Sequence, residues 1–233
     1  MRSSIKRPTE EECDLSGFQL FKKLTDPEVI RLNDEKTCSF YTKGSIIYRE
    51  GSRLTGFFCV TKGIIKIYKT GIDGKEQIIR FAKKGDIIAY RSLLSQELAC
   101  TASKVIEDAV VCHIPYLTLL FLIQSNWEFS LHMLQIVCKE LRDANDYITD
   151  IAQKTVRERL AEILLILKDD FELDNAQTLQ ISLTREELAN MVGTATESII
   201  RLLSEFKQDH LIELQGRKIK LLNIQGLRKV ANL

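Results

Sequence analysis

Short runs of apolar and β-branched residues, separated by glycines, occupy residues 37 to 113. Such runs predict strands, and the Asp73-Gly74 pair between two of them is a strong hairpin signal because glycine tolerates positive φ. The segments KGSIIY (43–48) and KGDIIAY (84–90) form a weak internal repeat. Together these features predict a closed or double-sheet β unit with a small interior.

The pattern changes at Pro115, after which neither glycine nor proline occurs as far as Leu167. We expect this whole stretch to be helical. Apolar residues within it recur at alternating spacings of three and four, as in a coiled-coil seam. That spacing alone fits a paired helix and a helix packed on its own domain equally well, but the length of the helix favours a parallel homodimer. The expected seam consists of Leu134, Val137, Leu141, Ala144, Ile148 and Ile151.

Two further elements follow. Residues 157–171, RERLAEILLILKDDF, have the pattern of an amphipathic helix and lead into an acidic polar loop. Residues 211–223, LIELQGRKIKLLN, predict a β-hairpin that turns at Gln215-Gly216. Its second strand carries or adjoins three basic residues, Arg217, Lys218 and Lys220.

Residues 184–206, TREELANMVGTATESIIRLLSEF, predict two short helices around a glycine. Thr184 with Glu187, and Thr194 with Glu197, have the spacing of two capping boxes. Gly193 between them suits the left-handed end of the first helix. The buried stripes are expected to be Leu188, Met191 and Val192 on the first helix, and Ile199, Leu202, Leu203 and Phe206 on the second.

Helices joined in this way form a helix-turn-helix, and a basic hairpin after them makes it winged. The exposed residues near the start of the second helix would then meet base edges in the major groove. Arg201 suits guanine and Glu197 suits cytosine. The alternative is a surface ion pair at i,i+4, worth about 0.3–0.5 kcal/mol. Exposed Ile200 favours DNA contact, because an apolar residue on a solvated face lacks a partner.

The composition of the chain excludes some classes of protein but does not by itself indicate a function. The net charge of +1 gives no bulk argument for nucleic acid, although from Arg201 onward seven basic residues stand against three acidic ones. The longest nearly apolar run is too short to span a bilayer and no signal sequence begins the chain, so we expect a cytoplasmic protein without a membrane partner. Six scattered cysteines without a C-x-x-C motif predict mostly buried thiols.

In its order of modules the chain resembles the Crp/Fnr family of transcription regulators. The resemblance rests on KGSIIYREG (43–51), VTKGIIKIY (60–68), DGKE (73–76), GDII (85–88) and the 184–206 segment. It implies that Glu197 and Arg201 read bases and that Arg185 contacts phosphate, while Thr196 replaces an arginine of the cyclic-AMP receptor and suggests a TTGA-like half-site. The residues expected at double-stranded DNA are Arg185, Thr194, Thr196, Glu197, Ile200, Arg201 and Lys218.

The resemblance gives less about a ligand. Ala89-Tyr90 and Ala99-Cys100 stand where the cyclic-AMP receptor has Gly-Glu and Arg-Ser, and Asn145 departs from its adenine-contacting pair. Without that arginine a buried phosphate would lack a counter-charge, so cyclic AMP is not the expected effector. Only Cys13 lies near the N-terminus, so we predict no iron–sulfur cluster, other metal or cofactor. An unidentified effector would meet Tyr90, Arg91, Ala99, Cys100 and Asn145.

We therefore expect an α+β protein made of a jelly-roll-like double-stranded β-roll (1–125), a dimerisation helix (126–154) and a winged helix-turn-helix (155–233). Its partners would be a second copy, a near-palindromic DNA site and RNA polymerase. A cupin-like oxygenase would need several histidines in the roll, where His113 is alone. The remaining alternative is a cyclic-nucleotide-binding-like module that acts through protein partners rather than DNA.

Overall fold

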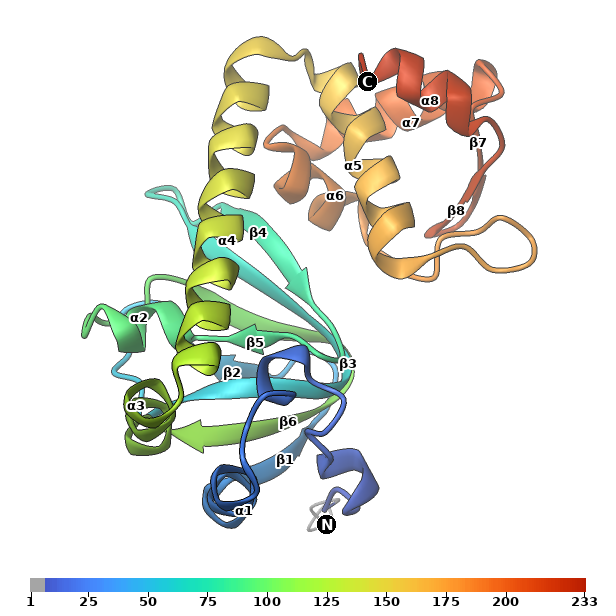
Figure 1. Cartoon of the computed structure of the whole chain (residues 1–233). Helices are drawn as coiled ribbons and strands as arrows, with labels where there is room; N and C mark the ends of the chain where they lie inside the picture. The colour runs from blue at the N-terminus through green and yellow to red at the C-terminus, as the bar shows by residue number, and fades with distance from the viewer. Residues whose placement is uncertain (1–6) are drawn as a thin grey trace, which may run out of the picture. The chain divides into compact units, whose positions relative to one another are not determined.

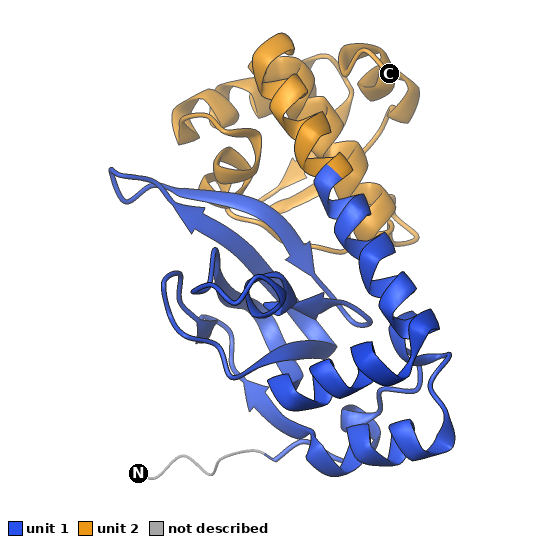
Figure 2. Cartoon of the chain, turned by 60° about the vertical axis from the view of Figure 1, so that its left-hand side comes forward, with its two compact units in different colours: residues 1–141 blue, residues 142–233 orange. Residues whose placement is uncertain are grey.

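The computed structural model describes residues 7–233 and is drawn in Figure 1. Its chain divides into two compact units, residues 1–141 and 142–233 (Figure 2). The division falls inside one long helix, α4 (Trp127–Gln153), so that this helix belongs to both units. The combination of antiparallel sheets with several helices confirms the predicted α+β class. The three predicted domain boundaries stay a prediction.

The first unit contains six strands and the helices around them. The strands are β1 (Thr37–Tyr41), β2 (Ile46–Tyr48), β3 (Gly56–Thr70), β4 (Glu76–Ala82), β5 (Ile87–Ile88) and β6 (Ala102–Pro115). The helices are η1 (Glu11–Cys13), η2 (Gln19–Phe21), α1 (Asp26–Glu35), α2 (Tyr90–Leu94), α3 (Tyr116–Ser125) and the first part of α4. These strands agree with the β structure expected over residues 37–113.

All strand pairs are antiparallel. The sheet order is β1-β6-β3-β4, with β2 also pairing β6 and β5 also pairing β3. The long strands β3 and β6 shift register three times between Val60 and Ile65, and such bulges let a strand bend. Gly63 lies at this point with φ +85°, and a Cβ there would come within 2.3 Å of the Asp108 carbonyl oxygen. The bend therefore requires glycine at residue 63.

Two apolar clusters fill the first unit. The one within the sheet gathers alternate residues of neighbouring strands, among them Val60, Ile65, Val105 and Val111. The other contains residues of the sheet, the N-terminal segment, α1, α3 and α4, and Phe21 and Phe129 stack across it with ring centroids 6.3 Å apart. The sheet thus has a core of its own and a second core shared with helices.

The continuous helix predicted from Pro115 to Leu167 is wrong, because the chain breaks twice. The Asn126 side chain accepts a hydrogen bond from the Phe129 backbone at 2.9 Å and so caps the start of α4. Thr155 caps α5 (Val156–Phe171) in the same way, with Glu158 completing a capping box. Asparagine and threonine are favoured at helix starts, so the signal for both breaks was present in the sequence.

The second unit holds the end of α4, then α5, α6 (Arg185–Val192), α7 (Thr196–Gln208), β7 (Ile212–Gln215), β8 (Lys218–Leu221) and α8 (Ile224–Val230). The hairpin turns at Gly216, as predicted, and pairs Gln215 with Lys218. Helix α8 was not predicted. It packs on α5, and the Asn223 side chain caps its start by accepting from the Gly226 backbone at 2.7 Å.

Candidate nucleic-acid interface

The first helix of the expected DNA-binding segment is held at its start by side chains. The Thr184 hydroxyl accepts from the Glu187 backbone at 3.1 Å, and the Glu187 carboxylate accepts from the Thr184 backbone at 2.8 Å. This is the predicted capping box. Gly193 ends α6 with φ +73°, and its N–H donates to the Ala189 carbonyl at 2.9 Å. The left-handed residue turns the chain sharply toward α7.

The second predicted capping box, of Thr194 with Glu197, is wrong. Helix α7 begins at Thr196, its N-cap is Ala195, and no side chain bonds to that end. The turn is one residue longer than the box would allow, because the Thr194 N–H continues the previous helix by donating to the Ala189 carbonyl at 3.1 Å. Glu197 is exposed in the first turn of α7, where a carboxylate also complements the helix dipole.

Helix α7 separates its apolar and polar faces as predicted. Four side chains are buried in the unit's core: Ile199, Leu202, Leu203 and Phe206. On the other face Glu197 and Arg201 are exposed, and Ile200 exposes 51% of its surface. Thr194 and Thr196 are half-buried beside them. One turn of helix therefore presents an acid, a cation and an apolar group together to whatever binds there.

The cation of this face is only loosely held. Arg201 Nη1 lies 3.3 Å from Glu205 Oε1, and 71% of the Arg201 side chain is exposed. Glu205 is itself bound by Arg157, whose Nη1 lies 2.9 Å from Glu205 Oε2 and whose Nη2 lies 2.6 Å from Asp209 Oδ2. The Arg157 guanidinium also lies 4.8 Å from the centre of the Phe206 ring. Arg157 thus fixes α7 to α5, a role that was not predicted.

Arg185 connects α6 to the hairpin. Its Nη2 donates to the Gly216 carbonyl at 2.8 Å, while its Nη1 is buried without a partner among the described residues. The expected phosphate-contacting arginine therefore also positions the turn of the hairpin. Lys218, on the second strand, is exposed, whereas Lys220 Nζ lies 3.7 Å from Glu213 Oε2 on the first strand. Lys218 is the freer of the two cations.

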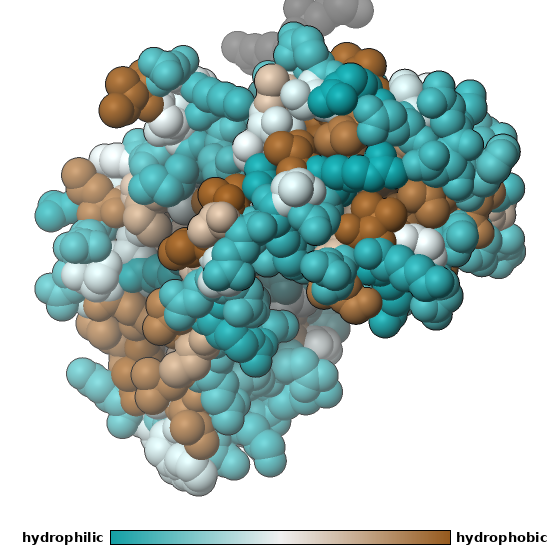
Figure 3. Space-filling model, turned by 90° about the horizontal axis from the view of Figure 1, so that it is seen from above, coloured by the Kyte–Doolittle hydropathy of each residue, from teal (hydrophilic) through white to brown (hydrophobic). Residues whose placement is uncertain are grey.

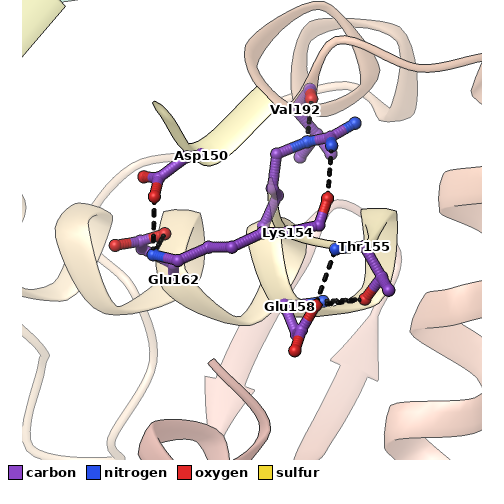
Figure 4. Close-up of polar contacts among 7 residues, drawn as sticks. Asp150, Lys154, Thr155, Glu158, Glu162 and Val192 are labelled. Carbon is purple, nitrogen blue, oxygen red and sulfur yellow. Dashed lines mark hydrogen bonds and ion pairs between the residues drawn. The ribbon is translucent and has the colours of Figure 1, made fainter. Parts of the chain in front are cut away.

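A charged cluster holds the turn between α4 and α5 (Figure 4). Lys154 Nζ lies 2.8 Å from Asp150 Oδ1 and 2.6 Å from Glu162 Oε2. Burial opposes the charge of Lys154, but the two carboxylates outweigh it and raise the pKa of the amine. Arg159 donates to the Val192 carbonyl at 3.0 Å and to the Lys154 carbonyl at 2.8 Å. Because Val192 ends α6, this arginine ties the α4–α5 turn to the helix-turn-helix.

The expected effector pocket contains an internal carboxylate. Glu140 of α4 pairs with two arginines: its Oε1 lies 3.3 Å from Arg80 Nε, and its Oε2 lies 3.3 Å from Arg91 Nε. Burial raises the pKa of Tyr90, and the neighbouring Glu140 charge raises it further, so the phenol stays protonated. The space left between them is about 20 Å³, and Cys100 also lines it. A cavity of that size holds about one water molecule.

Two of the five predicted pocket residues do not line this space. Ala99 is packed in the sheet's own core, and Asn145 belongs to the second unit and is exposed. Sequence reasoning also missed Glu140 and Arg80. These residues lie far apart in the chain, so only the folded sheet brings them together.

The predicted seam of α4 is largely exposed. Leu134, Leu141, Ile148 and Ile151 expose between 41 and 65% of their surface, and Ala144 is also exposed. Val137 is half-buried because it packs against the core shared by the sheet and helices. The same stripe extends back to Leu131 and Trp127, which were not predicted. On the face drawn in Figure 3, apolar side chains gather between hydrophilic ones.

The prediction of mostly buried thiols is wrong. A disulfide joins Cys38 to Cys112, and the sulfurs of Cys13, Cys38 and Cys112 all lie within 4.8 Å of one another. A group of three cysteine sulfurs this close together could hold a metal ion, so the prediction of no metal or cofactor is not confirmed. Cys100 and Cys138 are exposed, and Cys59 alone is a buried thiol.

Among the helices of residues 7–233, none has the length and apolar content needed to cross a membrane.

Comparison with known proteins agrees with this architecture. The family model described as a Crp-like helix-turn-helix domain matches residues 158–230, and the one described as a cyclic nucleotide-binding domain matches residues 39–126. The transcriptional activator protein FnrA of Stutzerimonas stutzeri is 26% identical over 224 residues, covering 95% of this chain and 91% of that protein. The fumarate and nitrate reduction regulatory protein of Vibrio cholerae is 26% identical over 227 residues, covering 96% and 90%.

Solved structures show the same fold. FixK2 from Bradyrhizobium japonicum superposes with a TM-score of 0.75 at 26% identity, covering 84% of this chain and 96% of that one. The match to a Crp-like helix-turn-helix domain, together with relatives named as transcriptional activators, identifies a DNA-binding transcription regulator. The chain belongs to the Crp/Fnr family.

The cavity beside Tyr90 and the cysteine cluster can each be compared with the size and donor set that a ligand needs. A cyclic nucleotide is far larger than the 20 Å³ beside Tyr90, and the single carboxylate of Glu140 already pairs with both arginines there. An all-cysteine iron–sulfur cluster takes four thiolates. Here two of the three clustered sulfurs are bonded to each other, and burial strongly raises the pKa of the remaining neighbour, Cys59.

Proposed function

We propose that the chain works as a homodimer on near-palindromic DNA, with α7 of each copy in a major groove. The observation that carries this proposal is the exposed face of α7, where Arg201 and Glu197 stand free of the core beside exposed Ile200. Arg201 would donate to guanine and Glu197 would accept from cytosine. Thr194 and Thr196 lie at the edge of the same face, where their hydroxyls can reach the sugar–phosphate backbone.

Arg185 and Lys218 would hold the backbone phosphates on either side of α7. Arg185 already fixes the hairpin through the Gly216 carbonyl, so its contribution includes placing Lys218. Thr196 replaces an arginine of the cyclic-AMP receptor and leaves fewer base contacts, which favours a TTGA-like half-site. Phosphate contacts position the protein, and the base contacts set the sequence.

The second copy would join along α4. Isolated exposed leucines are ordinary on a protein surface, but a stripe repeating over the length of one helix has the pattern of a coiled-coil partner surface. A two-fold axis along this seam would place two α7 helices on inverted half-sites about 34–36 Å apart.

The effector and the protein partner are proposed from two other observations. Because Glu140 occupies the arginine pair, we propose that any effector of the sheet unit must displace that carboxylate. The names of the relatives, which are transcriptional activators, favour contact with RNA polymerase. A protein with these partners would act in the cytoplasm.

Selection of bound fragments from random double-stranded DNA tests this function. The full chain is expected to enrich two inverted TTGA-like half-sites separated by about one helical turn. Enrichment of unrelated sequences, or of a single half-site without symmetry, would contradict the proposal. Repeating the selection with a metabolite extract reports whether an effector changes the site or the affinity.

A further inference from the structure

Three cysteines from distant parts of the chain meet at one edge of the sheet. Strand β1 pairs with β6 so that Cys38 lies directly opposite Cys112, and the two are joined in a disulfide. Cys13, at the end of η1, keeps its thiol, and its sulfur lies within 4.8 Å of both disulfide sulfurs. A thiol this close to a disulfide is placed for exchange, in which a thiolate attacks one sulfur and expels the other.

The three sulfurs differ in access. Cys13 and Cys38 are half-buried, whereas Cys112 is fully buried. Cys59 lies opposite Cys112 on its other side, in β3, but its thiol is fully buried and burial strongly raises its pKa. Cys59 is therefore inert, and Cys38 is the disulfide sulfur that a reagent in solvent can reach.

An open hollow of about 590 Å³ leads to this edge, and Cys13 and Cys38 both line it. Two cations, Arg7 and Lys36, also line it, and among residues 7–233 no carboxylate does. Glu12 lies near Cys13, but its carboxylate is paired with Lys62 at 2.9 Å. Lys36 donates to the Cys13 carbonyl at 2.8 Å, which holds the cation beside the thiol. The hollow is therefore sized for a small molecule and favours an anionic one.

We propose that Cys13, Cys38 and Cys112 form a thiol-exchange site for a small anionic thiol of the glutathione class. The thiolate of that molecule attacks Cys38 Sγ; a bond forms between the two sulfurs and the Cys38–Cys112 bond breaks. Cys112 leaves as a thiolate and takes up a proton. Cys13, as a thiolate, then attacks Cys38 Sγ, forms a Cys13–Cys38 disulfide and expels the small thiol.

The net change moves one disulfide and oxidises nothing: the Cys13 thiol is consumed, the Cys112 thiol is formed and the small thiol is regenerated. The external thiol acts first because burial raises the pKa of Cys13, an effect that the nearby Lys36 only partly offsets, so its thiolate is scarce. Before exchange the disulfide joins β1 to β6; after it, the disulfide joins β1 to the N-terminal segment. In reducing compartments such mobile disulfides are usually catalytic or redox-sensing.

The test uses the full chain, oxidised with diamide and then exposed to reduced glutathione, with acid quenching, alkylation and peptide mapping by mass spectrometry. Wild-type protein is expected to yield Cys13–Cys38 disulfide, and Cys13→Ser is expected to accumulate glutathione on Cys38. Cys138→Ser, an exposed cysteine outside the cluster, serves as the control and should match the wild type. Failure of diamide to produce Cys38–Cys112, or the absence of a Cys38 adduct in Cys13→Ser, would overturn the proposal.

The charge preference is tested by comparing glutathione with neutral 2-mercaptoethanol. Lys36→Gln is expected to slow adduct formation by glutathione several-fold relative to 2-mercaptoethanol. Lys139→Gln, an exposed lysine on α4, should leave that ratio unchanged. An equal effect of Lys36→Gln on both thiols would show that the cation does not select the reagent and would overturn that part of the proposal. Thermal melting of each variant establishes that it is folded.

Discussion

Arg201 Nη1 lies 3.3 Å from Glu205 Oε1, one turn toward the C-terminal end of α7, and not against Glu197. Within residues 7–233 no side chain forms a hydrogen bond or ion pair with Glu197. The alternative explanation, a surface ion pair between Glu197 and Arg201, therefore does not apply. An exposed pair such as Arg201 with Glu205 is worth under about 1 kcal/mol, so DNA can recruit the guanidinium at little cost.

Arg157 of α5 holds α7 in place, and its removal should weaken the attachment of α7 to α5. It binds Glu205 and Asp209 and lies over Phe206. Because these carboxylates are half-exposed, we expect Arg157→Ala to lower the free energy of unfolding by only about 1 kcal/mol. Urea denaturation measures this change. Arg228→Ala, an exposed arginine on α8, is the control, and equal effects of the two substitutions would argue against the anchoring role.

The capping box at the start of α6 should contribute measurably to stability. Thr184→Ala removes the hydroxyl that accepts from the Glu187 backbone and is expected to cost about 1 kcal/mol. Ser204→Ala removes a hydroxyl that only returns to the Ile200 carbonyl of its own helix, so its effect should stay within about 0.5 kcal/mol. Denaturation curves that do not separate the two variants would contradict the capping assignment.

The seam of α4 should determine the oligomeric state. Leu141 exposes 61% of its surface, and Leu141→Glu would place a charge at the centre of the proposed contact. We expect light scattering to report a dimer for the wild type and a monomer for this variant, and specific DNA affinity to fall with it. Lys139→Glu introduces the same charge on the same helix away from the stripe. A Leu141→Glu protein that stays dimeric would place the dimer contact elsewhere.

The carboxylate of Glu28 should make stability depend on pH. Burial alone would raise its pKa, but hydrogen bonds from the Thr25 backbone and from the Asn126 and Ser125 side chains outweigh burial and lower the pKa overall. A lowered folded-state pKa stabilises the protein above the unfolded value of about 4.3, and this contribution is lost as pH falls through the folded pKa. Glu28→Gln should therefore lose most stability at neutral pH.

Denaturation of wild type and Glu28→Gln between pH 3 and pH 7 measures this dependence. The difference in free energy of unfolding is expected to shrink as pH falls below about 4.3 and to disappear as pH falls through the lowered folded-state pKa of the wild-type carboxylate. A difference that stays constant over the whole range would mean that Glu28 acts by shape rather than by charge.

Local signals in the sequence predicted local structure well. Thr184, Glu187 and Gly193 lie within ten residues of one another, so their spacing was sufficient to place α6 and its end. The buried stripe of α7 followed from its period in the same way. The breaks at Asn126 and Thr155 were missed because a long apolar pattern concealed two ordinary N-cap residues.

Contacts between distant residues could not be predicted. Cys38 and Cys112 are 74 residues apart, and only the register of β1 on β6 makes them opposite partners. Likewise Glu140 meets Arg80 and Arg91 only when α4 packs beside the folded sheet. No spacing rule links such residues, so the internal carboxylate of the pocket and the three-cysteine cluster emerged from the tertiary fold.

The ratio of specific to random DNA affinity in Arg201→Ala tests the central claim most directly. It is measured by fluorescence anisotropy at fixed salt, with a selected palindromic site and a scrambled duplex. Loss of a guanine contact is expected to cost about 1–3 kcal/mol of specific binding per half-site, which lowers the ratio roughly five- to 150-fold for each half-site. Lys218→Ala should weaken binding to both duplexes alike and leave the ratio intact. An unchanged ratio in Arg201→Ala would contradict the account.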